Sequence, residues 1–122
     1  MEGVKFVCDV GRARGGSERY LGGMVRHILL LKPKPEATAA SIEASRVALA
    51  ALMGRIPGLL DFCWGVNFAA TERRQGYDFG FTMDFVDRES LAAYNPHPEH
   101  QAAAALVRAS FEDIAVLDFD LK

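Results

Sequence analysis

The segment YNPHPEH, from Tyr94 to His100, places two of the chain's three histidines beside a tyrosine and a glutamate. An imidazole titrates near neutral pH, so His100 could take a proton from an activated carbon or oxygen and later return it. The Tyr94 hydroxyl could hold a carbonyl oxygen and stabilise the negative charge that develops on it. The pair is therefore a candidate general base with an oxyanion partner.

Other interpretations of this segment remain open. Pro96 and Pro98 stiffen a turn, so Tyr94 and His100 could instead hold that turn and begin a helix, or contact a ligand without reacting with it. His97, Glu99 and His100 also raise the question of a metal site. Because the prolines break the segment, these three side chains need not converge, and no metal is predicted.

The third histidine, His27, lies in MVRHILLLK, which is β-prone and apolar on both alternating faces. Such a strand is covered on both sides and central in its sheet. His27 shares a face with Leu29 and Leu31 and should point toward the helices. It is there either a satisfied core group or part of a pocket.

The elements that position these residues alternate between strands and helices. Thr38 is predicted to cap the first helix, and Asp87 a short helix that ends at Tyr94. Alternating apolar residues, from Leu60 to Phe68 and from Tyr77 to Phe85, predict two strands joined by the loop ATERRQG. The predicted strands are 24–32, 59–69, 76–86 and 114–121, and the predicted helices are 36–56, 87–94 and 98–107.

This order is the split βαβ arrangement of ferredoxin-like α+β folds, an antiparallel four-stranded sheet with helices on one face. Apolar side chains would be exposed on the other face unless something covered them. We expect a second copy to cover them, giving a homodimer by sheet-to-sheet packing, a dimeric α+β barrel. Asp78 and Asp84 share that face and would need a partner if buried. The apolar residues are Ile28, Leu30, Ala115, Leu117 and Phe119.

Composition limits the classes of partner. The 122 residues carry a net charge of -2, which gives no electrostatic reason to expect nucleic acid. No apolar run approaches the ~20 residues of a membrane span, and no secretory signal begins the chain, so a cytoplasmic protein is expected. Cys8 and Cys63 are accordingly predicted to be reduced thiols.

The chain is divided into an N-terminal extension, 1–23, and a domain, 24–122. The extension is rich in glycine and arginine after a strand-like start. It could add an edge strand, be disordered, or reflect a start that really lies at Met24.

Five stretches, MVRHILLLK, IPGLLDFCWGVNF, GYDFGFTMDF, YNPHPEH and VLDF, resemble in order and spacing the stress-responsive A/B barrel domain, or Dabb, family. The resemblance implies the same fold and dimer. Family members include stress-induced proteins without settled chemistry and a cofactor-free cyclase that closes a polyketide by aldol condensation. That cyclase's catalytic histidine corresponds to His100, its tyrosine to Tyr94 and its first-strand histidine to His27. Two further polar groups of its site fall on Phe79 and Leu49.

The resemblance also implies a hydrophobic pocket between the sheet and the helices, although the same residues could equally form core. The predicted function is a homodimeric A/B barrel protein of unassigned activity with a small apolar or aromatic ligand and no cofactor. The alternatives are a cofactor-free lyase, cyclase or isomerase with His100 as general base, and a monooxygenase of the dimeric α+β barrel group. The predicted ligand-binding residues are Leu29, Leu31, Leu49, Phe79, Phe81, Phe111, Ile114 and Val116.

Overall fold

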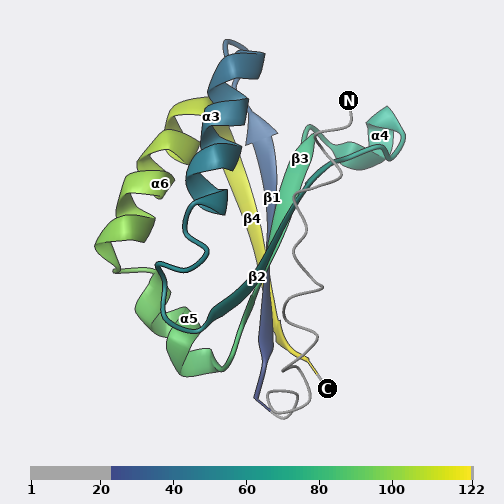
Figure 1. Cartoon of the computed structure of the whole chain (residues 1–122). Coiled ribbons are helices and arrows are strands. Elements are labelled where there is room, and N and C mark those ends of the chain that lie inside the picture. The colour runs from purple at the N-terminus through teal and green to yellow at the C-terminus, as the bar shows by residue number, and fades with distance from the viewer. Residues whose placement is uncertain (1–22, 122) are drawn as a thin grey trace.

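The computed structural model describes residues 23–121 (Figure 1). Apart from Gly23, the predicted N-terminal extension lies outside the described residues. In chain order the elements are β1 (Val25–Pro33), α3 (Ala39–Ala50), β2 (Leu59–Val66), α4 (Thr71–Arg74), β3 (Phe79–Phe85), α5 (Arg88–Tyr94), α6 (Pro98–Ser110) and β4 (Phe111–Asp120).

The four strands form one sheet in the order β2-β3-β1-β4, with antiparallel neighbours throughout. Strand β1 is central, as its apolar character on both faces predicted. Its register places Leu29 between Phe81 of β3 and Val116 of β4. The predicted ferredoxin-like fold is confirmed. Strand β4 begins at Phe111 rather than Ile114, because α6 continues to Ser110 and the chain then turns directly into the sheet.

Helices α3 and α6 lie side by side on one face of the sheet, and α5 packs at one end of that face (Figure 1). The core lies between the two layers, where apolar side chains leave water and contribute roughly 1.5–3 kcal/mol each. It includes Val25, Leu31, Leu49, Phe62, Met83, Phe85 and Val107.

The helix caps agree with the prediction. Thr38 Oγ1 accepts a hydrogen bond of 3.0 Å from the Ser41 N–H, and Ser41 Oγ accepts one of 3.1 Å from the Thr38 N–H. This reciprocal pair is a capping box, which satisfies two N–H groups at the start of α3. Asp87 likewise accepts from the Ser90 N–H at 2.8 Å. Helix α3 ends at Ala50 rather than at residue 56, and turns follow, with φ of 85° at Gly54.

The hairpin between β2 and β3 differs from the prediction at two points. The segment ATERRQG is not all loop, because α4 forms one helical turn, which Gln75 ends with φ of 54°. Phe68 is not on the apolar face and is 97% exposed. Strand β2 stops before it because the Asn67 side chain binds the Ala69 N–H and the Tyr77 carbonyl, at 3.0 and 2.8 Å.

The face of the sheet opposite the helices, called the outer face here, carries apolar side chains as predicted. Leu30, Leu117 and Phe119 are 42%, 56% and 40% exposed. Asp84 is buried on this face, and Arg26 donates two hydrogen bonds to its carboxylate, at 2.8 and 2.9 Å. A charge-assisted bidentate pair of this kind satisfies a buried carboxylate, so Asp84 does not oppose coverage of the outer face.

Two further polar residues bear on the predictions. Asp78 accepts a hydrogen bond of 3.1 Å from Arg74 Nε, so this carboxylate also has a partner within the chain. Cys63 on β2 is disulfide-bonded, and the prediction that it is a reduced thiol is wrong. That prediction rested on the expected cytoplasmic location and not on the surroundings of Cys63 in the fold, which explains the failure.

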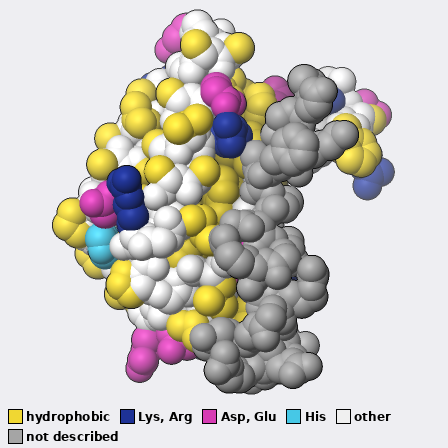
Figure 2. Space-filling model, in the orientation of Figure 1, with side chains coloured by type: hydrophobic (Ala, Val, Ile, Leu, Met, Phe, Trp, Pro, Cys, Tyr) yellow, Lys and Arg dark blue, Asp and Glu magenta, His cyan; other side chains and the backbone are white. Residues whose placement is uncertain are grey.

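Charges over the helical layer are mixed. In Figure 2 the basic side chains on the visible face lie beside acidic ones rather than in a patch. The pairs Arg46 with Glu43 and Arg55 with Glu99 belong to this layer. This face therefore has no basic stripe of the kind that binds phosphate backbones. Within residues 23–121, the structure has no helix with the length and apolar character needed to cross a membrane.

Candidate active site

The segment YNPHPEH joins two helices. Tyr94 is the last residue of α5, and α6 begins at Pro98, a favoured residue for the first helical position. His97 caps α6, since its Nδ1 accepts a hydrogen bond of 3.0 Å from the Glu99 N–H. His97 thus has a structural task. No group of three His, Cys, Asp or Glu side chains arranged to hold a metal occurs in the described part of the chain.

Tyr94 and His100 lie together across this turn, with ring centroids 4.2 Å apart. His100 Nδ1 is 2.8 Å from the carbonyl oxygen of Asn95. A carbonyl only accepts, so Nδ1 carries the hydrogen, and in the neutral ring the lone pair is on Nε2. The fold therefore fixes the tautomer that a general base with Nε2 as the basic atom requires.

His27 points toward the helices, as predicted from strand alternation. Its ring lies 6.0 Å from that of Tyr94 and 6.4 Å from those of Phe81 and Phe85. Its Nδ1 is 2.5 Å from Oδ1 of Asp118, its register partner on β4. Asp118 orients the His27 ring, and the sequence analysis did not identify it. The alternation of β4 could have revealed it only once the register with β1 was known.

The surroundings set the protonation states of Tyr94 and His100. Burial lowers the pKa of His100 below its ordinary value of 6.5, against the opposing effect of the Asn95 carbonyl, and His27, Arg108 and His97 lower it further. His100 is thus neutral and basic at pH 7. Burial raises the pKa of Tyr94 well above its ordinary 10, so its hydroxyl remains a hydrogen-bond donor.

A cavity of about 130 Å³ between the sheet and the helices brings these side chains together. All three predicted catalytic residues line it. So do four of the predicted ligand-binding residues, Leu29, Leu49, Phe81 and Ile114. The lining set is His27, Leu29, Leu49, Phe81, Tyr94, His100, Ala104, Val107, Arg108 and Ile114.

Four predicted ligand-binding residues do not line this cavity. Leu31 is fully buried in the core, opposite Phe79 in the register. Phe79 contacts Phe111, with ring centroids 6.1 Å apart, toward the Pro33 end of β1. Val116 is 57% exposed. Leu31, Phe79 and Phe111 share the orientation of the lining residues but lie further along the strands, whereas Val116 is beside Leu29 on the edge strand β4 and is open to solvent.

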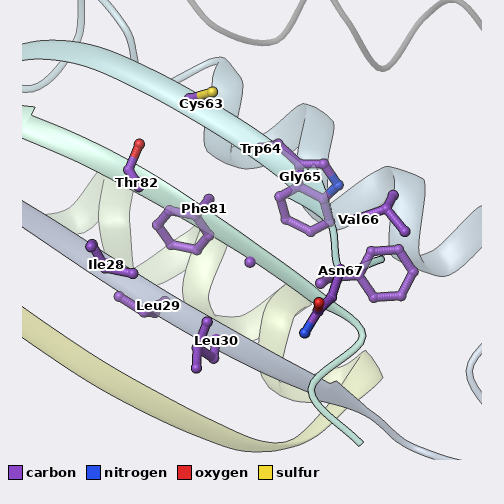
Figure 3. A pocket seen from close by; sticks show the side chains of 12 residues that line it. Ile28, Leu29, Leu30, Cys63, Trp64, Gly65, Val66, Asn67, Phe81 and Thr82 are labelled. Atoms are coloured by element: carbon purple, nitrogen blue, oxygen red, sulfur yellow. The ribbon is translucent and has the colours of Figure 1, made fainter. Parts of the chain in front are cut away.

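A larger depression of about 380 Å³ lies on the outer face, over Gly65 and Gly80 (Figure 3). A Cβ at Gly80 would lie 2.8 Å from the Leu29 carbonyl oxygen, so this position excludes any side chain. Gly65 is the register partner of Gly80. Among the described residues that line this depression there is no histidine, acid or lysine. Its surface is suited to packing rather than to proton transfer.

The β2-β3-β1-β4 sheet, covered by helices on one face and apolar on the other, defines the class of ferredoxin-like α+β proteins. Residues 25–121 match the family model of the stress responsive A/B barrel domain, and the chain belongs to this family.

Three relatives illustrate the range of the family. Protein HS1 of Arabidopsis thaliana, a stress-response A/B barrel domain-containing protein, is 30% identical over 97 residues, which are 80% of this chain and 89% of HS1. Olivetolic acid cyclase of Cannabis sativa is 27% identical over 95 residues, 78% of this chain and 94% of the cyclase. A solved dimeric ferredoxin-like protein of unknown function from a Jannaschia species is 33% identical, with a TM-score of 0.70, over 80% of this chain and 98% of that one.

Proposed function

We propose that this protein is a homodimer that binds a small, largely apolar molecule in the cavity between its sheet and α6, and moves a proton on that molecule without a cofactor. The observation that carries the proposal is the hydrogen bond of 2.8 Å from His100 Nδ1 to the Asn95 carbonyl, which leaves Nε2 as the basic atom of a neutral imidazole.

The proposed step begins with transfer of a proton from an activated carbon or oxygen of the ligand to His100 Nε2. The Tyr94 hydroxyl donates a hydrogen bond to the oxygen on which negative charge develops. The imidazolium then returns the proton to another atom of the ligand. Such a sequence serves a lyase, a cyclase or an isomerase.

The aldol chemistry of the related cyclase is not proposed. Two positions that are polar in that enzyme's site hold Phe79 and Leu49 in this chain, and Phe79 does not line the cavity. The apolar wall of the cavity favours ligands with few polar groups, because such ligands lose few hydrogen bonds to water when they enter it.

The proposed dimer joins two outer faces. Leu30, Leu117 and Phe119 are exposed on that face, and the Arg26–Asp84 pair already satisfies the buried carboxylate beside them. The Jannaschia relative is dimeric, which supports a dimer of this chain. The depression over Gly65 and Gly80 would receive side chains of the second copy.

The test is deuterium incorporation from D2O into small phenyl ketones and 1,3-dicarbonyl compounds, followed by NMR. His100→Gln keeps an N–H for the Asn95 carbonyl but removes the base, and the exchange rate should fall by about 10²–10⁴-fold. His97→Asn is the matched control, because it removes a histidine of the same segment outside the cavity and keeps a capping acceptor. Equal exchange in the wild type and His100→Gln would refute catalysis by His100. Binding of these compounds without exchange would indicate a ligand-binding module.

A further inference from the structure

We propose that the ligand of this cavity is a single-ring organic anion, of the size of benzoate, whose charge is bound by Arg108. The inference rests on the proposed function, because it concerns the same cavity and names the class of molecule that the cavity selects.

The volume limits the ligand to one ring. At about 130 Å³ the cavity is close in size to an engineered apolar cavity of ~150 Å³ that binds benzene. Pockets for drug-sized ligands are larger, roughly 300–1,000 Å³. A six-membered ring with a short polar substituent fills this volume, and the second ring of a fused system would extend through the opening into solvent.

The deep end of the cavity matches the flat apolar faces of such a ring. Leu49, Phe81 and Val107 are 2%, 4% and 5% exposed and come from α3, β3 and α6. Aromatic side chains favour offset or edge-to-face contact with another ring. The lining residues that reach the surface are Arg108, which is exposed, and Leu29, His100, Ala104 and Ile114, which are half-buried. The opening therefore lies beside α6, and Arg108 stands at it.

The electrostatic character of the lining favours an anion. The cavity is lined by two imidazoles, a phenol and the Arg108 guanidinium, and none of the described lining residues is acidic. The carboxylate of Asp118, beside this lining, is already bound to His27 Nδ1. Arg108 lines the cavity, and its positive charge there also lowers the pKa of His100. A carboxylate or phenolate at the opening would therefore be attracted, and Arg108 presents the planar donor geometry that a carboxylate accepts.

Arg108 is also available for a ligand. Within residues 23–121 it forms no ion pair or hydrogen bond with another residue, whereas most of the other arginines in that range do. The paired arginines are Arg26, Arg46, Arg55, Arg74 and Arg88. Arg108 lies in the last turn of α6, where a cation also favours the helix dipole. If Arg108 only stabilised the helix dipole, its substitution would change stability slightly and would not affect the preference for an anionic ligand. Ligand binding therefore distinguishes a helix-stabilising role from a ligand-binding role.

The experiment is calorimetric titration of the intact chain with benzoate, with the isosteric neutral amide benzamide, and with 2-naphthoate. The variants are Arg108→Gln and the matched control Arg73→Gln, which removes the same charge from α4. Wild type and Arg73→Gln should bind benzoate about tenfold tighter than benzamide, a difference of about 1.4 kcal/mol, because a hydrogen bond to a charged group is stronger than one to a neutral group. Arg108→Gln should lose that preference, and 2-naphthoate should bind more weakly than benzoate. Shifts of the Tyr94 and His100 ring resonances would place the ligand in the cavity.

Equal binding of benzoate and benzamide, or a preference that survives in Arg108→Gln, would refute the anion while leaving the cavity and its base intact. Tighter binding of 2-naphthoate would refute the size limit. Failure of all three rings to bind would also overturn the inference. The proposed proton transfer fails separately, through the deuterium exchange of His100→Gln.

Discussion

Replacing Tyr94 by Phe should separate function from stability. Tyr94 is 2% exposed, and within residues 23–121 its hydroxyl makes no hydrogen bond, so burial alone accounts for its raised pKa. Burial of a hydroxyl without a partner costs about 1–3 kcal/mol on protein scales. The Tyr94 oxygen is not among the completely enclosed polar atoms of the described residues, which reduces the cost. The variant should therefore be as stable as the wild type or more stable, by up to about 1 kcal/mol.

The same substitution should impair chemistry. A donor that stabilises a developing oxyanion contributes about 10²–10³-fold to turnover. Tyr94→Phe should lower the deuterium exchange rate by about that factor, while benzamide or benzoate still binds. Urea denaturation measures the stability. The urea midpoint of Tyr94→Phe should be no lower than that of the wild type, and the dependence of the unfolding free energy on urea should be unchanged.

The matched control is Tyr77→Phe. The Tyr77 hydroxyl donates to Asp113 Oδ2 at 2.6 Å, and neither residue lines the cavity. Because both groups are exposed to solvent, loss of that bond should change stability little and leave exchange unchanged. If Tyr94→Phe were destabilised by more than about 1 kcal/mol, its hydroxyl would be a structural group, and the oxyanion role would lose its support.

Three further outcomes are expected. The exchange rate should rise with pH through a midpoint below 6.5, because burial lowers the pKa of His100, and should stay level until pH is well above 10. Asp118→Asn removes the charge at His27 Nδ1, and should change the ¹⁵N shifts of that ring but not the helical circular dichroism; unchanged shifts would contradict the contact. Leu117→Glu should convert the dimer to a monomer in size-exclusion chromatography, and Leu106→Glu on α6 should not; a dimer in both would exclude the outer face.

The alternation of apolar and polar residues predicted the fold, because successive side chains of a strand point to opposite faces of the sheet and the pattern is visible within each strand. His27 could be placed on the helix side of β1, and Asp84 on the outer face, without knowledge of any other strand. The caps Thr38 and Asp87 were visible because capping depends on residues within one helical turn.

The rest of the site depends on contacts between residues that are far apart in the sequence. Asp118 lies beside His27 because the register of β1 and β4 pairs the two residues, and the sequence alone does not predict that register. Phe79 and Phe111 share the helix side with the cavity but lie further along the sheet. Arg108 was missed because α6 is rich in alanine, and its pattern does not specify which side faces the sheet.

Strand β4 serves two surfaces through consecutive residues. Leu117 and Phe119 lie on the outer face, and Asp118 between them holds His27 on the opposite side. In a dimer through the outer face, the partner would restrain the same edge strand that orients a site residue. Subunit association and ligand affinity would then be thermodynamically linked, so that dilution weakens ligand binding and the ligand, in turn, favours the assembled form.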